Sequence, residues 1–121
     1  MSTNNIEEIA SYIVSEGKGI LAADESNPTC GKRFDSIGVE STENNRRDYR
    51  EMLFRASGMK DNIGGVILFD ETIRQNAKDG TSLLDVINSQ GALPGIKVDK
   101  GLQSIGDSDE SLTVGLDGLD E

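Results

Sequence analysis

Three short apolar runs, separated by helical patterns, are the feature that most constrains how this chain can fold. The runs cover residues 19–23, 64–69 and 94–99. The first two show no alternation of apolar and polar residues, which is typical of strands buried on both faces of a parallel sheet. Strands joined by helices imply parallel pairing with right-handed crossovers. The sequence therefore predicts an α/β fold with the element order α-β-α-β-α-β.

The helices are predicted from apolar residues spaced at i, i+3, i+4 and i+7. A first helix has this stripe at Ile6, Ile9, Ala10 and Ile13, with Asn4 as its N-cap and Gly17 as its stop. A second helix follows Ser41 or Thr42 as cap and ends before Gly58. Its apolar stripe consists of Tyr49, Met52, Leu53 and Ala56. Shorter helical stretches are expected at 32–37, around 72–78 and up to Gly91.

The charge balance and composition exclude several classes of function. The 121 residues include 22 acidic and 12 basic side chains and no histidine, for a net charge of −10. Nucleic-acid-binding modules neutralise phosphates with clustered basic residues, so we expect no nucleic-acid partner. No apolar run approaches the roughly 20 residues that span a bilayer, so we expect no membrane partner. The lack of histidine, with a single cysteine, excludes the usual zinc sites and Cys-His or Ser-His-Asp catalysis.

The N-terminus and the single cysteine bear on localisation, and the C-terminal segment differs in composition from the rest of the chain. The N-terminus has neither a basic segment nor an apolar segment of a signal peptide, and Cys30 cannot form an intrachain disulfide. These features favour a soluble cytoplasmic protein. Residues 1–100 are predicted to be the βα units of a single partial domain. Residues 101–121 contain six acids and no base, and we expect an acidic Gly/Ser/Asp-rich loop that leads to a truncated helix near Leu116.

Charged and hydroxyl side chains follow each of the three predicted strands. Ligands of parallel α/β sheets bind at the carboxyl ends of the strands, so these clusters are candidates for a site. The clusters are Asp24, Glu25 and Ser26 after the first strand, Asp70 and Glu71 after the second, and Lys97, Asp99 and Lys100 at the end of the third.

Each candidate also has a purely structural interpretation. Strand alternation places Lys97 and Asp99 on one face, where they form either a structural ion pair or part of a binding site. Asp24 either ends a strand, caps a helix or takes part in chemistry. The hydroxyls of Ser26 and Thr29 bind a phosphate or belong to an ordinary turn.

The helix arginines have the same two interpretations. Arg33, Arg46 and Arg47 either bind an anion or lie solvated on a helix surface.

Together these clusters resemble the N-terminal part of the class I fructose-1,6-bisphosphate aldolases. The resemblance runs in order over nearly the whole chain, which makes it far more specific than any single motif. The matching segments are residues 17–26 (GKGILAADES), 32–33 (KR) with 36–38 (SIG), 44–47 (NNRR) with 49–50 (YR), 64–69 (GGVILF) with 71–72 (ET), 95–101 (GIKVDKG) and 115–119 (GLDGL).

The resemblance implies a (β/α)8 TIM barrel, of which this chain would supply the first three parallel strands and their connecting helices, leaving the barrel incomplete. The family cleaves fructose 1,6-bisphosphate reversibly into dihydroxyacetone phosphate and glyceraldehyde 3-phosphate in glycolysis. A family lysine forms a Schiff base with the substrate ketone, so no metal and no cofactor are expected. The implied partner is a small sugar bisphosphate, and the family is commonly a homotetramer.

The resemblance also assigns roles to individual residues. Asp24 matches a catalytic aspartate that assists the carbinolamine and Schiff-base steps. Ser26 matches a serine near a substrate phosphate, and Thr29 stands where the family often has a second phosphate-binding serine. Three further residues match substrate-binding positions: Arg33 and Lys97, which contact phosphate, and Asp99, which lies beside that lysine.

The length of the chain departs from the family. A TIM barrel takes about 250 residues, and the family's Schiff-base lysine and main acid/base glutamate lie on later strands. We therefore expect a fragment of a longer aldolase, or a poor folder, that does not cleave the substrate by itself. The alternatives are a non-catalytic truncated product or interaction module, and a Schiff-base aldolase that acts on a monophosphate.

Overall fold

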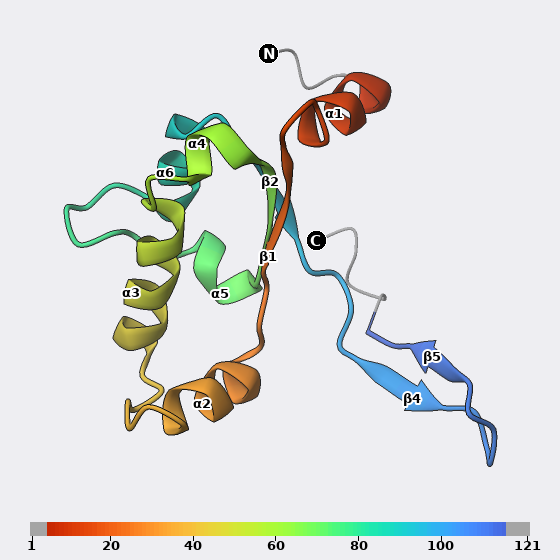
Figure 1. The fold of residues 1–121 in the computed structure, drawn as a ribbon. Helices are drawn as coiled ribbons and strands as arrows, with labels where there is room; N and C mark the ends of the chain where they lie inside the picture. Colours follow the sequence, from red (N-terminus) through yellow and green to blue (C-terminus); the bar gives the residue numbers. More distant parts are fainter. Residues whose placement is uncertain (1–4, 116–121) are drawn as a thin grey trace.

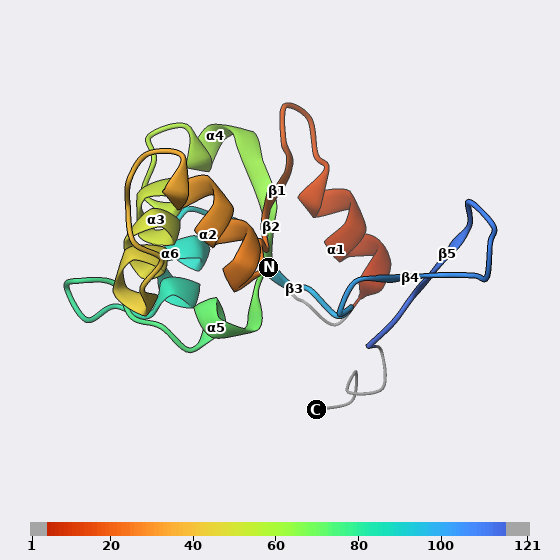
Figure 2. The ribbon, with the colours of Figure 1, turned by 90° about the horizontal axis from the view of Figure 1, so that it is seen from below.

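Three strands form a parallel sheet at the centre of the molecule. The structure is a computed structural model that describes residues 5–115. The sheet contains β1 (Gly19–Ala23), β2 (Ile63–Leu68) and β3 (Leu93–Ile96) in the order β1-β2-β3, with both neighbouring pairs parallel (Figures 1 and 2). The predicted parallel α/β arrangement and its alternation of helices and strands are confirmed.

The helices lie on both sides of this sheet. Figures 1 and 2 place α3 and α6 on one side and α1 on the other. No helix among residues 5–115 is long and apolar enough to cross a membrane. The helices are α1 (Ile6–Ile13), α2 (Asn27–Asp35), α3 (Glu43–Phe54), α4 (Met59–Asn62), α5 (Asp70–Ile73) and α6 (Leu83–Ser89).

The apolar core lies between one face of the sheet and the helices α3 and α6. Burial of these apolar side chains is the main force that holds the helices against the strands. The expectation that β1 is buried on both faces is wrong for the described residues, because Ile20 is 52% exposed on the second face. The core includes Ala23, Val66 and Leu68 from the strands, Phe54 from α3, and Leu83, Val86 and Ile87 from α6.

The helix caps agree only partly with the sequence prediction. The side chain of Asn5 caps α1 and accepts hydrogen bonds from the main-chain N–H groups of Glu7 and Glu8. The expected cap, Asn4, lies outside the described residues. Thr42 caps α3 by accepting a 3.1 Å hydrogen bond from the main-chain nitrogen of Asn45, which decides between the two predicted caps.

The predicted apolar stripe of α3 coincides only in part with its buried face, since only Leu53 of the stripe packs against the core. Met52 is 61% exposed, and Ala56 lies beyond the end of the helix. The buried positions are instead Arg50 and Phe54, which are four residues apart and therefore share a face. Periodicity of apolar residues missed this face because one of its members is an arginine.

The segment after β3 is more ordered than predicted. Strand β3 ends at Ile96 rather than Asp99, although the Lys97 main-chain nitrogen still donates to the oxygen of Leu68 at 2.8 Å. Instead of the expected loop, residues 102–113 form an antiparallel hairpin of β4 (Leu102–Ser104) and β5 (Ser111–Thr113). The helix expected near Leu116 lies outside the described residues.

Gly64 marks a close approach between the sheet and α1. The register between β1 and β2 shifts between Gly19 and Ile20, which leaves Gly64 as an extra residue in β2. A Cβ atom on Gly64 would lie 2.8 Å from the carbonyl carbon of Ile13 and closer still to its oxygen. Only glycine therefore lets the last turn of α1 rest on the sheet.

We predict that Gly64→Ala destabilises the chain by about 1–3 kcal/mol, because the added methyl group forces α1 away from the sheet. Gly19→Ala is the matched control, since nothing lies within 4 Å of a Cβ there. Thermal unfolding of both variants, followed by circular dichroism, checks this. Equal unfolding temperatures for the two variants would contradict the close contact.

Candidate functional site

The register of the sheet brings the carboxyl ends of all three strands to one level. Ala23 pairs with Leu68, and Leu68 pairs with Ile96, so the three strands end side by side. The residues that follow are Asp24 after β1 and Lys97 after β3. Parallel sheets bind ligands at this edge, so the candidate residues lie where the fold favours a site.

Lys97 lies between two carboxylates that come from different parts of the chain. Its Nζ atom is 3.5 Å from Oδ2 of Asp24 and 3.7 Å from Oδ1 of Asp99. The second oxygen of Asp99 accepts a hydrogen bond of 2.9 Å from the main-chain nitrogen of Gly101, which fixes that carboxylate. The side chain of Lys97 is 28% exposed, so a ligand can still reach the ammonium group. An ion pair forms here, and it leaves the lysine accessible.

Lys97 and Asp99 also line a depression beside the carboxyl ends of β2 and β3. Its volume is about 600 Å³, and Phe69 and Ile73 form an apolar part of its wall. An apolar wall with a few charged groups is the usual make-up of a small-molecule site. Asp24 reaches this depression only through its contact with Lys97.

Ser26 and Thr29 lie together at the first turn of α2. Their hydroxyl oxygens are 3.1 Å apart. Ser26 occupies the N-cap position, and its main-chain oxygen accepts from the nitrogen of Cys30 at 2.9 Å, which starts the helix. Burial raises the pKa of the Cys30 thiol above its usual value, so the thiol is unsuited to act as a nucleophile.

Arg33 is separated from the lysine cluster and bound to Glu25. Its Nη1 atom is 3.0 Å from Oε2 of Glu25 and donates to the hydroxyl of Tyr49 at 3.5 Å. The hydrogen bond from Arg33 to Tyr49 is the main reason that the pKa of Arg33 is raised. The structure thus joins Asp24, Lys97 and Asp99 directly, and it connects Arg33 to them only through Glu25, the neighbour of Asp24.

Two further arginines, Arg46 and Arg50, bind the segments that follow β2 and β1. The sequence did not predict this role. Arg46 and Glu71 form a bidentate pair with distances of 2.8 and 2.9 Å, and their side chains are 11% and 19% exposed. This pairing lowers the pKa of Glu71 below its usual value. Arg50 is fully buried and donates to the main-chain oxygen of Glu25 at 2.6 Å. The interpretation of Arg46 as a solvated helix residue is therefore wrong.

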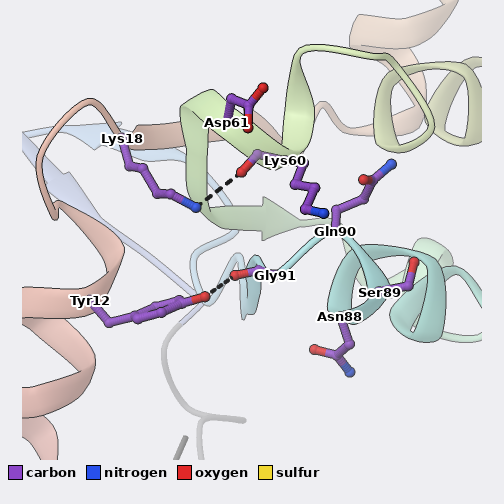
Figure 3. A pocket seen from close by; sticks show the side chains of 8 residues that line it. All are labelled: Tyr12, Lys18, Lys60, Asp61, Asn88, Ser89, Gln90 and Gly91. Carbon is purple, nitrogen blue, oxygen red and sulfur yellow. Dashed lines mark hydrogen bonds between the residues drawn. The ribbon is translucent and has the colours of Figure 1, made fainter.

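A second depression, of about 490 Å³, is lined by residues of α1, α4 and the end of α6 (Figure 3). The hydroxyl of Tyr12 donates there to the main-chain oxygen of Gly91, and Lys18 Nζ donates to the oxygen of Lys60 at 3.0 Å. None of the predicted site residues lines it. The predicted site residues therefore lie away from this depression.

Comparison with known proteins gives consistent matches. The family model described as fructose-bisphosphate aldolase class-I matches residues 5–121. Fructose-bisphosphate aldolase 1 from the chloroplast of Chlamydomonas reinhardtii is 55% identical over 113 residues, which cover 93% of this chain and 30% of that protein. The cytosolic fructose-bisphosphate aldolase 6 of Arabidopsis thaliana is 55% identical over 111 residues, which cover 91% and 31%.

A solved structure agrees with these relatives. Fructose-bisphosphate aldolase of Plasmodium falciparum, in a complex with TRAP and a small-molecule inhibitor, is 48% identical with a TM-score of 0.87. The match covers 93% of this chain and 33% of that one. The chain thus spans about a third of the length of the relatives that it matches.

We predict that Glu71→Gln lowers the free energy of unfolding at pH 7 by about 1–3 kcal/mol, because Arg46 loses its charged partner. The pKa of Glu71 is lower in the folded chain than in the unfolded chain. Its contribution is therefore complete above the ordinary pKa of about 4.3 and is lost as the pH falls through the lower folded-state value.

The difference between the Glu71→Gln variant and the original chain should consequently shrink in acid. Urea unfolding at a series of pH values checks this. Asp70→Asn is the control, because Asp70 and its partner Arg74 are both mostly exposed and such pairs contribute little. A difference that stays constant from pH 7 to acid would contradict the role of the ion pair.

Proposed function

Because the chain belongs to the class I fructose-bisphosphate aldolase family, we propose that it is the N-terminal third of an enzyme that cleaves fructose 1,6-bisphosphate. The products are dihydroxyacetone phosphate and glyceraldehyde 3-phosphate, and the reaction is reversible. The three parallel strands and their helices are the N-terminal part of the family's TIM barrel, and within residues 5–115 they form an open sheet and not a closed barrel. The strands and helices that follow in the family would complete it.

The observation that carries this proposal is the placement of Lys97 between Asp24 and Asp99 at the carboxyl edge of the sheet. An ammonium group between two carboxylates, beside a depression with an apolar wall, fits an anionic sugar substrate. A lysine ammonium has three N–H donors, so it can turn from one carboxylate to a phosphate oxygen. Asp99, held by the main-chain nitrogen of Gly101, would keep the lysine oriented during this exchange.

We assign the catalytic role within this chain to Asp24. Formation of a Schiff base adds a lysine amine to the ketone of the substrate and then expels the oxygen as water, which requires proton transfers to that oxygen. A carboxylate at the rim of the site can carry such protons. The lysine that attacks the ketone belongs, in the family, to a later strand, so Asp24 would act on chemistry that the rest of the barrel provides.

The phosphate-binding groups come from two places. Lys97 follows β3, whereas Ser26, Thr29 and Arg33 all belong to α2 and its cap. Charge-assisted hydrogen bonds from arginine and lysine are the strong interactions that proteins make with phosphate. Two separate groups of donors suit a substrate that carries a phosphate at each end.

We further propose that the complete protein acts in glycolysis in the cytoplasm, as a homotetramer. A cytosolic relative supports the location, although a chloroplastic relative matches the chain equally well. The reaction proceeds through a Schiff base and needs no metal ion in this proposal.

A hybrid barrel tests the proposed function. It joins residues 1–121 to the part of the cytosolic Arabidopsis thaliana aldolase that follows the matched segment. We expect the hybrid barrel to cleave fructose 1,6-bisphosphate, to prefer it to fructose 1-phosphate, and to be inactivated by borohydride in the presence of substrate, since borohydride reduces a Schiff base. The isolated 121-residue chain, measured in parallel, should show no cleavage. A folded hybrid barrel without turnover would contradict the proposal.

Substitutions at Asp24 and Lys97 should separate chemistry from binding in the hybrid barrel. We predict that Asp24→Asn lowers kcat by roughly 100-fold with little change in KM, because it removes a proton carrier. Lys97→Met should raise KM for the bisphosphate at least about 10-fold, because it removes a phosphate contact. Steady-state kinetics with the bisphosphate decides between these patterns. A change in KM alone for Asp24→Asn would make that residue a binding group instead.

A further inference from the structure

Arg50 is a fully buried charged residue to which the resemblance to the family assigns no role. It lies in the middle of α3, with 0% of its surface exposed. Its guanidinium lies near the ring of Tyr49, 5.8 Å from the ring centre. Charged side chains are almost never fully buried without a specific partner, so this position calls for an explanation.

The partner of Arg50 is a main-chain atom of the loop that carries the candidate catalytic residue. The Nη2 atom donates to the main-chain oxygen of Glu25 at 2.6 Å, and the Sγ atom of Cys30 approaches the same oxygen at 3.8 Å. Glu25 lies directly between Asp24 and Ser26 in the sequence. A fixed peptide oxygen at Glu25 therefore restricts the backbone on both sides of it.

Arg50 does not have the contacts expected of a residue that only fills space or neutralises a charge. Within residues 5–115 its Nε and Nη1 atoms are buried without a hydrogen-bond partner. The nearby carboxylates already have other arginines, since Glu25 pairs with Arg33 and Glu71 pairs with Arg46. An apolar side chain of similar volume would avoid the cost of burying these polar atoms. Compared with such an apolar side chain, the guanidinium contributes the hydrogen bond to the main-chain oxygen of Glu25.

We propose that Arg50 is a positioning residue that holds the 24–26 loop so that the Asp24 carboxylate stays beside Lys97. The effect on turnover rests on the proposed function. The claim that Arg50 holds the loop does not depend on it. The guanidinium is planar and rigid, and it reaches the loop from the core side of the sheet, whereas Lys97 approaches Asp24 from the end of β3. The loop is thus held between a buried cation and an accessible one.

A structural measurement tests the first half of the proposal without any need for activity. Arg50→Met and Arg50→Lys are made in the hybrid barrel, and amide hydrogen exchange is measured for peptides that cover residues 20–30. We expect exchange there to be at least ~10-fold faster in both variants, because local opening of the loop becomes easier. The lysine variant keeps the charge and most of the packing, so it remains informative if the methionine variant fails to fold.

The matched control is Arg55→Met at the C-cap of the same helix. Arg55 pairs with Glu51 and Asp79 on the surface and does not contact the loop. Exchange of residues 20–30 should be unchanged in this control. Unchanged exchange in Arg50→Lys would overturn the proposal, whether or not the hybrid barrel is active.

A double-mutant cycle tests the second half, the action through Asp24. Alone, Arg50→Lys should lower kcat about 10-fold or more, because a displacement near 1 Å at a reacting group has effects of this size. In the Asp24→Asn background the same change should lower kcat by less than about 3-fold, since the group that Arg50 positions has lost its function. A merely structural role would give the same factor in both backgrounds and would overturn the proposal.

The two measurements keep failure of this inference separate from failure of the proposed function. A folded hybrid barrel that does not cleave the bisphosphate contradicts the proposed function, and hydrogen exchange still decides whether Arg50 positions the loop. An active hybrid barrel with equal effects in both backgrounds contradicts the role of Arg50 alone.

Discussion

The parallel register of β2 with both of its neighbours is the constraint on which the rest of the structure depends. Because Ala23, Leu68 and Ile96 lie at one level, the residues after β1 and β3 meet above the end of β2. Lys97 can then reach across to Asp24, which is 73 residues earlier in the chain. A slip of one residue would turn these side chains to the other face of the sheet and separate them. The charged cluster is thus a consequence of strand pairing.

Helix α3 couples this sheet to the candidate site through a single face. Arg46, Arg50 and Phe54 are spaced four residues apart, so they point the same way. Phe54 packs in the apolar core, Arg50 binds the loop after β1, and Arg46 binds Glu71 in the segment after β2. Packing of the core therefore fixes where both arginines lie relative to the sheet. The arginines in turn hold the segments that follow β1 and β2. Stability and the geometry of the site depend on the same helix.

The sequence predicted the parts of the fold that follow from apolar patterns and missed those that follow from buried polar groups. The three strands, their order and the helix after Thr42 were predicted because runs of apolar residues and capping residues are local signals. The buried face of α3 was missed because Arg50 counts as polar in any such pattern. The hairpin of β4 and β5 was missed because its strands are three residues long and mostly polar, so its main-chain hydrogen bonds decide the structure.

In the candidate site, too, the sequence predicted the accessible groups and missed the buried polar ones. Asp24 was named because it follows a predicted strand, and Lys97 and Asp99 because they lie at the end of another. The structure brings them together because the sheet is parallel. The residues that hold the loops carry no local signal, since a pair such as Arg46 and Glu71 is 25 residues apart and meets only in the folded chain. The site thus has accessible charged groups, which the sequence pattern indicates, and a buried layer of residues, such as Arg46 and Arg50, that hold the loops. The buried layer decides whether the accessible groups keep the distances that chemistry requires.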